Sequence, residues 1–251
     1  MTDPDEMQAR SRSFGSVAAG YAAHRPTYPA DAVAFLVGRE RPLRVLDLGA
    51  GTGLLTEVVR ELGHHALAVD PSAEMLAELT ARLPDVEAVV GAAESIPVDD
   101  ASVDAVVAGQ AAHWFDAEAA AAEIRRVLRP GGVLGLIWNA RDERVPWVAA
   151  LGAALAAEAR GHEADQSVVD DFSAALSADV RVVESTVVQR VTPDQVVDGI
   201  ATRSYVAVMD DDRRAAFLGR IRALLAEHPD TRDRRELELP DVTRAYRLTP
   251  G

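Results

Sequence analysis

The chain contains no lysine and no cysteine, and all 26 of its basic residues are arginine. Without cysteine it can form no disulfide, and it has no thiolate that could hold a metal or act as a nucleophile. Its 40 acidic residues outnumber the basic ones and give a formal net charge of −14. Such an excess of negative charge argues against binding to nucleic acid or to an anionic membrane surface.

Long apolar segments are also absent. The longest run without a charged residue covers 13 residues, 145–157, whereas a membrane-spanning helix needs about 18 or more. The first residues, Met1-Thr2-Asp3-Pro4-Asp5-Glu6, are acidic and lack the basic and then apolar order of a signal peptide. Of the 251 residues, 48% are hydrophobic, which predicts a globular chain. We expect a soluble, cytoplasmic protein.

Five short apolar runs have the length and β-branched content of buried strands. They cover residues 43–48, 66–69, 86–90, 103–108 and 133–138. Helical stretches alternate with these runs, at residues 52–62, 72–82 and 116–128. This order predicts a parallel sheet with right-handed crossovers, covered by helices on both faces.

The second part of the chain has a different pattern. Thr192-Pro193-Asp194-Gln195 is a favourable helix start, with Thr192 as N-cap and Gln195 completing a capping box. A polar stretch at residues 160–171 predicts a loop. The other expected elements are helices at 146–160, 193–209 and 213–227 and strands at 181–191 and 236–248.

A glycine-rich segment, Asp47-Leu48-Gly49-Ala50-Gly51-Thr52-Gly53, follows the first predicted strand. A turn of this kind between a strand and a helix lets the backbone come close to a ligand. A dinucleotide-binding G-x-G-x-x-G pattern would place its third glycine at position 54, which is Leu54. A P-loop would need a lysine, which the chain lacks. The spacing therefore disfavours both and leaves other nucleoside ligands open.

Asp70 ends the second predicted strand, 21 residues after Gly49. A carboxylate there can accept hydrogen bonds from both hydroxyls of a ribose that lies across the strand tips. The third and fourth strands lead into the segments Gly91-Ala92-Ala93-Glu94-Ser95-Ile96-Pro97 and Gly109-Gln110-Ala111-Ala112-His113-Trp114-Phe115-Asp116. These strand ends are predicted to face the same crevice, and the pattern fits an adenosine ligand without a pyrophosphate.

In this order, and with Leu128-Arg129-Pro130-Gly131-Gly132 after them, these segments resemble the class I S-adenosylmethionine-dependent methyltransferases. Within that family the chain is most similar to the small-molecule branch known as methyltransferase type 11. The resemblance implies an α/β fold: a Rossmann-like, doubly wound, mostly parallel sheet of seven strands with helices on both faces. The last strand would be antiparallel, with a helical insertion before it.

The resemblance also implies a domain organisation. We expect one methyltransferase domain over residues 1–251. It would comprise an N-terminal helical flap (1–40), a cofactor-binding core (41–140), and a segment that completes the sheet and roofs the substrate (141–251).

S-adenosylmethionine is the cofactor that the resemblance implies, with S-adenosylhomocysteine as product. Gly49, Ala50 and Gly51 would pass the methionine half, and Asp70 would hold the ribose. The other implied cofactor contacts are Pro71 and Met75 beside the adenine, Ala93 and Glu94 at its edge, Gln110 and Ala111 on the strand-four side, and Tyr21 and Arg25 from the flap. Many relatives have aspartate where this chain has Ala92, and the Ala93 backbone or the Glu94 side chain would replace its contact with adenine.

His113 follows the fourth strand and is a candidate general base; the alternative is a pocket-wall residue whose ring bonds to the backbone. Candidate substrate contacts are Tyr28, Trp114, Trp138, Arg203 and Tyr205. Packing is the alternative for the two tryptophans, and solvation is the alternative for Arg203. No metal site is predicted.

The implied reaction is in-line transfer of a methyl group to a small-molecule acceptor. Positioning and desolvation would drive it, since orientation alone can supply roughly 7–11 kcal/mol. Two other functions stay open: an inactive cofactor-binding partner protein, and a nucleotide-dependent oxidoreductase, which Leu54 disfavours. The acceptor atom is open among carbon, oxygen and nitrogen, and the oligomeric state between monomer and homodimer.

Overall fold

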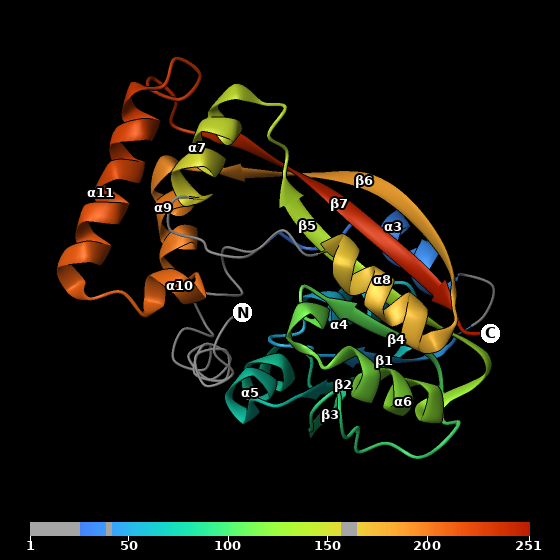
Figure 1. Cartoon of the computed structure of the whole chain (residues 1–251). Helices are drawn as coiled ribbons and strands as arrows, with labels where there is room; N and C mark the ends of the chain where they lie inside the picture. The colour runs from blue at the N-terminus through green and yellow to red at the C-terminus, as the bar shows by residue number, and fades with distance from the viewer. Residues whose placement is uncertain (1–25, 39–41, 157–164) are drawn as a thin grey trace. The chain divides into compact units, whose positions relative to one another are not determined.

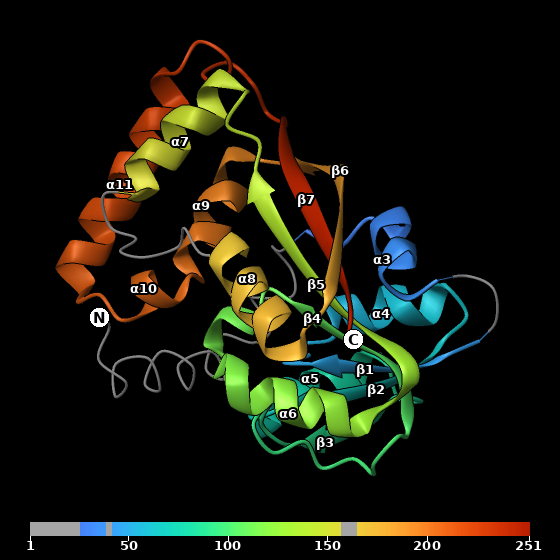
Figure 2. The ribbon, with the colours of Figure 1, turned by 45° about the vertical axis from the view of Figure 1, so that its right-hand side comes forward.

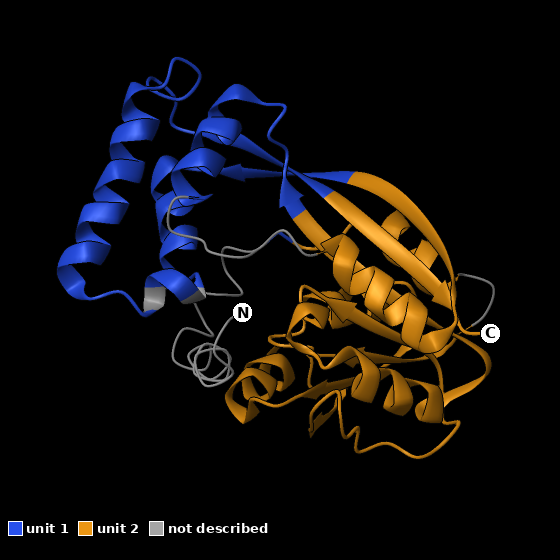
Figure 3. Ribbon diagram, viewed as in Figure 1, with its two compact units in different colours: residues 1–26, 140–162, 186–242 blue, residues 27–139, 163–185, 243–251 orange. Residues whose placement is uncertain are grey.

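The computed structural model describes residues 26–38, 42–156 and 165–251. The chain divides into two compact units, coloured separately in Figure 3. We call them the sheet unit (27–139, 163–185 and 243–251) and the helical unit (1–26, 140–162 and 186–242). The single domain and its boundaries at residues 40 and 140 stay predictions.

Seven strands form one sheet in the order β3-β2-β1-β4-β5-β7-β6 (Figure 1). The paired neighbours among β1 to β5 are all parallel. β7 runs antiparallel between β5 and β6, as Figures 1 and 2 show. The predicted mixed sheet with an antiparallel last strand is therefore confirmed. The strands are β1 (Arg44–Leu48), β2 (His65–Asp70), β3 (Glu87–Val90), β4 (Val103–Gly109), β5 (Leu128–Arg141), β6 (Asp179–Val191) and β7 (Leu237–Thr249).

Alternation along the strands divides the core of the sheet unit between two faces. On one face, Val45 of β1 and Val107 of β4 belong to a buried cluster with α3 and α4. On the other face, Leu46 and Val106 belong to a cluster with α6 and α8. The helices of this unit are α3 (Ala30–Val37), α4 (Leu54–Glu61), α5 (Ala73–Arg82), α6 (Ala117–Val127) and α8 (Asp165–Leu176). Because both faces are covered, the strands are apolar on both sides, as the sequence predicts.

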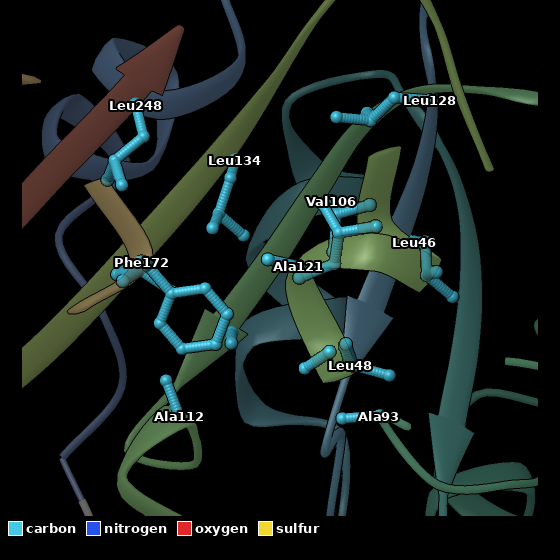
Figure 4. Packing of buried hydrophobic residues seen from close by; sticks show 14 of the residues in the cluster. Leu46, Leu48, Ala93, Val106, Ala112, Ala121, Leu128, Leu134, Phe172 and Leu248 are labelled. Atoms are coloured by element: carbon cyan, nitrogen blue, oxygen red, sulfur yellow. The ribbon is translucent and has the colours of Figure 1, made fainter. Parts of the chain in front are cut away.

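The loop predicted over residues 160–171 is wrong from Asp165 onward, where α8 begins. Val169, Phe172 and Leu176 follow one another at helical spacing and are at most 1% exposed. Figure 4 shows Phe172 pointing into the buried cluster of the sheet unit. Three apolar residues on one helix face outweigh the polar remainder, because tertiary packing supplies most of a helix's stability.

Side-chain caps begin two of the helices, and one of them is the predicted capping box. Asp116 is the N-cap of α6, and its carboxylate accepts from the backbone N–H groups of Glu118 and Ala119. Thr192 begins α9 (Pro193–Ala201) with both hydrogen bonds of the predicted capping box, since Gln195 reciprocates. These contacts lie within a few residues of one another, which is why the sequence alone reveals them.

The helix predicted over residues 193–209 is interrupted. α9 ends at Ala201, and a short helix, α10 (Ser204–Ala207), follows the extended residue Arg203. The Thr202 hydroxyl donates to the carbonyl oxygen of Gly199 at 2.9 Å, a side-chain bond of the kind that competes with helix continuation.

The helical unit has its own core. α7 (Pro146–Ala156), α9, α10 and α11 (Asp211–Glu227) surround a cluster that includes Trp147, Val197 and Phe217. The start of β7 adds Leu237 and Leu239 to it. Among the described residues, no helix is both long and apolar enough to cross a membrane.

Candidate cofactor-binding site

The carboxyl ends of β1, β2 and β4 meet at one edge of the sheet, because these strands are parallel neighbours. β1 leads into the glycine loop (residues 49–53), β2 ends at Asp70, and β4 ends at Gly109. The fold thus brings together the segments in which the sequence predicts a cofactor site.

The glycine loop has a backbone that only glycine adopts without strain. Gly49, Gly51 and Gly53 have φ angles of +72°, +55° and +86°. A Cβ added to Gly49 would lie 2.6 Å from the Cβ of Ala111, whereas one added to Gly51 would meet nothing within 4 Å. Gly49 therefore permits close packing against the segment after β4, and no described residue fills the space beside Gly51.

Asp70 accepts hydrogen bonds from the glycine loop and from the start of α5. Its Oδ2 accepts from the backbone N–H of Gly51 and its Oδ1 from that of Ser72, both at 2.8 Å. The residue is only 8% exposed. Burial raises the pKa of Asp70, and the two N–H groups oppose that rise. A carboxylate accepts at about four positions, so each oxygen keeps capacity for a further donor such as a ribose hydroxyl.

Asp47, to which the sequence reasoning assigned no role, is a second buried carboxyl at this edge. Its Oδ2 accepts from the Thr56 hydroxyl of α4 at 2.6 Å, while its Oδ1 has no partner among the described residues. Burial raises the pKa of Asp47 to about 7, the Thr56 bond lowers it in part, and the charge of Asp70 raises it further. One signal was available in the sequence, because an acidic residue inside an otherwise apolar strand must find a partner.

The segment after β3 makes a tight turn, closed by a bridge between Ala92 and Ser95. Glu94 is exposed, and its Oε1 accepts from the backbone N–H of Asp116 at 2.9 Å. Ala93 is buried at 4% exposure in the core of the sheet unit. The Glu94 side chain therefore braces the start of α6, and the turn keeps Ala93 fixed beside the strand tips.

Gln110, directly after β4, has a φ of +56°, which non-glycine residues rarely adopt. Its side-chain N–H donates to the carbonyl oxygen of Asn139 at 2.8 Å. The Asn139 side chain accepts from the Thr243 hydroxyl at 2.6 Å and donates to the carbonyl oxygen of Thr27 at 3.2 Å. These bonds join β4, β5, β7 and the segment before α3, and they hold the strained residue in place.

His113 and Trp114 lie on a single 3-10 turn, η2 (Ala112–Trp114), and both are half-buried. Their ring centroids are 4.9 Å apart. Tyr28 is 7% exposed, and a Cβ added to Gly109 would lie 2.6 Å from its hydroxyl oxygen. The Tyr28 hydroxyl thus reaches the end of β4.

Trp138 is 3% exposed and packs edge-on against Tyr246, with 5.9 Å between ring centroids. Its indole N–H has no acceptor among the described residues. The structure therefore shows Trp138 in a packing role, which is one of the two roles predicted for it.

The remaining predicted residues are distributed as follows. Ala50, Met75 and Ala111 are buried in the sheet unit and Pro71 is exposed. Arg203 and the buried Tyr205 belong to the helical unit. Tyr21 and Arg25 lie outside the described residues. Within the described ranges no group of three or more histidine, aspartate or glutamate side chains is arranged to hold a metal.

An uncharacterized methyltransferase of Mycobacterium tuberculosis is 44% identical to this chain over 239 residues, which are 95% of this chain and 96% of the relative. The chain belongs to the methyltransferase family. The family model of a methyltransferase domain matches residues 46–136, which hold the glycine loop and Asp70. A malonyl-[acyl-carrier protein] O-methyltransferase of Enterobacter lignolyticus is 34% identical over 196 residues, covering 70% of this methyltransferase and 78% of the relative.

Solved structures agree with this family. A protein assigned as a type II methyltransferase from Anaeromyxobacter dehalogenans has a TM-score of 0.68 and 26% identity, covering 90% of this chain and 97% of the other. One assigned to an antibiotic biosynthesis pathway of Anabaena variabilis has a TM-score of 0.63 and 21% identity, covering 85% and 95%, and shows the fold alone. The resemblance to class I S-adenosylmethionine-dependent methyltransferases is confirmed, and S-adenosylmethionine is the cofactor of that family.

Proposed function

We propose that this methyltransferase transfers the methyl group of S-adenosylmethionine to a small-molecule acceptor, in the cytoplasm. The observation that carries the proposal is the hydrogen bond between the Gly51 N–H and Asp70 Oδ2, which joins the tips of β1 and β2. It fixes a carboxylate beside a backbone segment at which the described residues leave space. That arrangement suits a nucleoside ligand with ribose hydroxyls and no pyrophosphate.

The buried groups at this edge fit the proposed cofactor. Asp70 would accept from the ribose hydroxyls, and the backbone of Gly49, Ala50 and Gly51 would lie along the methionine half. The remaining proposed neighbours of the cofactor are Pro71, Met75, Ala93, Glu94, Gln110 and Ala111. Tyr21 and Arg25, outside the described residues, complete the proposal from the N-terminal segment.

When bound, S-adenosylmethionine supplies a methyl group on a sulfonium: a lone pair of the acceptor forms the new bond to carbon while the carbon–sulfur pair returns to sulfur. The protein's own task is to orient the acceptor and exclude water. A general base is needed only where the acceptor must lose a proton, and His113 would serve there. His113 is half-buried on the 3-10 turn that follows β4.

Carboxylic acids are the first acceptor class to examine. The relative from Enterobacter lignolyticus is named an O-methyltransferase, and a carboxylate is already deprotonated near neutral pH. Such an acceptor would need no base, and the His113→Ala variant would keep its activity.

Calorimetric titration with S-adenosylmethionine and S-adenosylhomocysteine tests the proposed site. We expect binding by the wild type and about 10- to 100-fold weaker binding by Asp70→Asn, since a hydrogen bond to a charged group contributes about 1.5–3 kcal/mol. Glu74→Gln, at an exposed position in the next helix turn, serves as control and should bind normally. A melting curve of each variant separates loss of binding from loss of fold.

Turnover is tested separately, by release of S-adenosylhomocysteine with panels of carboxylic acids, phenols and amines. Product formation with any panel supports the proposal. Absence of cofactor binding at millimolar concentration would contradict it, and so would methylation confined to protein or nucleic acid.

A further inference from the structure

A second pocket of about 490 Å³ lies at the opposite edge of the sheet, where β1, β4 and β5 begin. Because β7 is antiparallel, its last residues reach this edge too, beside the start of β6 (Figure 1). The end of α3 and the turn at residues 130–132 complete the wall. All of these residues belong to the sheet unit. β1 has five residues, so about 15 Å of strand separates this edge from the glycine loop.

Three arginines line this pocket, and only one is neutralised. Arg129 forms an ion pair with Asp104 at 2.9 Å, and the same carboxylate oxygen accepts from the backbone N–H of Arg44. Among the described residues of the pocket wall, Asp104 is the one carboxylate. Among the described residues, neither Arg181 nor Arg247 has a carboxylate within ion-pair distance.

The two remaining guanidinium groups are held in place by other means. Arg247 donates through Nη1 to the carbonyl oxygens of Phe35 at 3.1 Å and Leu36 at 2.8 Å, in the last turn of α3. Arg181 lies over the ring of Phe35, with 5.7 Å to its centroid. Arg247 is therefore fixed in orientation and the exposed Arg181 lies beside the same helix, and among the described residues their other N–H donors have no acceptor.

Arg181 and Arg247 line the same pocket and carry charges of the same sign. The pKa of Arg247 is lowered by burial and further by the charge of Arg181. This occurs in a chain whose acidic residues outnumber its arginines by 40 to 26. An oxyanion between the two groups would relieve the repulsion and accept charge-assisted hydrogen bonds from both.

We propose that this pocket binds a small anionic metabolite, whose phosphate or carboxylate group is held by Arg181 and Arg247. The planar fork of an arginine matches either oxyanion with two parallel hydrogen bonds. The pocket is larger than a single oxyanion requires, and Val37, Leu43 and Val133 provide apolar wall for the rest of the molecule. This binding is independent of the methyl-transfer reaction.

Titration calorimetry with inorganic phosphate, pyrophosphate and citrate, at constant ionic strength, tests the proposal. We expect at least one probe to bind with a dissociation constant in the millimolar range or below, and Arg181→Gln to weaken it about tenfold or more. Stronger binding of phosphate and pyrophosphate would assign a phosphorylated ligand, and stronger binding of citrate a carboxylated one. Arg222→Gln, which removes an exposed arginine of α11, is the matched control and should bind as the wild type does.

Two further measurements make the result decisive. Arg181→Lys keeps the charge without the fork, so we expect intermediate affinity. Saturation with S-adenosylhomocysteine should leave probe binding unchanged, because the two sites lie at opposite edges of the sheet. The proposal is wrong if no probe binds at millimolar concentration, if Arg181→Gln binds as tightly as the wild type, or if S-adenosylhomocysteine displaces the probe.

Discussion

Asp47 and Asp70 stand near the carboxyl ends of neighbouring strands, and both are almost fully buried. Asp70 accepts backbone N–H groups at both carboxylate oxygens, whereas Asp47 is bonded by Thr56 and its Oδ1 has no partner among the described residues. Backbone donors favour the charged form of a carboxyl, and burial with little hydrogen bonding favours the neutral form. Two aspartates thus acquire different roles. Asp70 is the proposed ligand for ribose, and Asp47 is a buried carboxyl whose pKa is raised.

Asp47→Asn should change how stability depends on pH. Its pKa rises from 3.8 in the unfolded chain to about 7 in the fold. The folded state therefore binds more protons between these values, and its free energy of unfolding falls as pH rises from about 4 to about 7. Asparagine removes this titration. We expect the stability of the variant relative to the wild type to increase by on the order of 2–3 kcal/mol between pH 5 and pH 8, since each pH unit between the two pKa values contributes about 1.4 kcal/mol.

Urea denaturation at both pH values measures this difference. The difference near pH 5, where the Asp47 carboxyl of the folded state is still neutral, serves as the reference value, and its increase toward pH 8 reports the ionisation of that carboxyl in the fold. An equal difference between variant and wild type at both pH values would contradict a raised pKa.

At the scale of single elements, the glycine loop requires glycine for two reasons: its positive φ angles and, at Gly49, close packing. A Cβ at Gly49 would overlap Ala111, whereas a Cβ at Gly51 would meet no described residue within 4 Å. Alanine in the left-handed region costs about 1–2 kcal/mol at either position. Overlap with the Ala111 Cβ should add about 1–3 kcal/mol at position 49 alone.

The paired variants Gly49→Ala and Gly51→Ala separate the cost of the backbone conformation from the cost of the steric overlap. We expect Gly49→Ala to lower the free energy of unfolding more, and Gly51→Ala to fold but bind S-adenosylhomocysteine weakly, because its Cβ would enter the space beside Asp70. Denaturation and calorimetry measure the two effects. Equal stability of the two variants would argue against the close contact with Ala111.

The helix α8 offers a second test at this scale. Phe172 is fully buried in the core of the sheet unit, whereas its neighbour Asp171 is exposed. Phe172→Ala should lower the free energy of unfolding by about 3–5 kcal/mol, since it leaves a cavity. Asp171→Ala should change it by about 0.5 kcal/mol or less. Urea denaturation of both variants decides whether α8 is packed; similar values for the two would show that it is not.

Prediction from the sequence succeeds where an element carries its own signal. The runs that form β1, β2 and β4 are short, apolar and bounded by turn residues, and the caps Asp116 and Thr192 bond to groups within a few residues. α8 has no such signal, because its polar residues obscure three apolar positions whose partners lie far away in the chain. The break before α10 was missed because the competing bond of Thr202 is visible only in the structure.

At the scale of the whole molecule, the net negative charge destabilises the folded state. A net charge of −14 makes the folded chain repel itself. Surface ion pairs such as Arg60–Asp85 offset little of this, since each contributes about 0–1 kcal/mol.

Raising sodium chloride from about 0.02 M to about 0.3 M should therefore raise the melting temperature, because screening weakens long-range repulsion. Differential scanning calorimetry measures the change. The same rise in Arg181→Gln would show that screening causes it and not chloride in the arginine pocket. A fall in melting temperature would mean that ion pairs outweigh net repulsion.

Local patterns in the sequence determined the alternation of strands and helices, the glycine loop, the position of Asp70 at a strand end, and the resemblance to the methyltransferases. Each depends on residues that are neighbours in the chain or on fixed spacing. The tertiary structure decided the burial and raised pKa of Asp47, the packing of α8, and the placement of Arg181 and Arg247 in the wall of one pocket. These depend on residues far apart in sequence, and the antiparallel course of β7 is what brings the last two together.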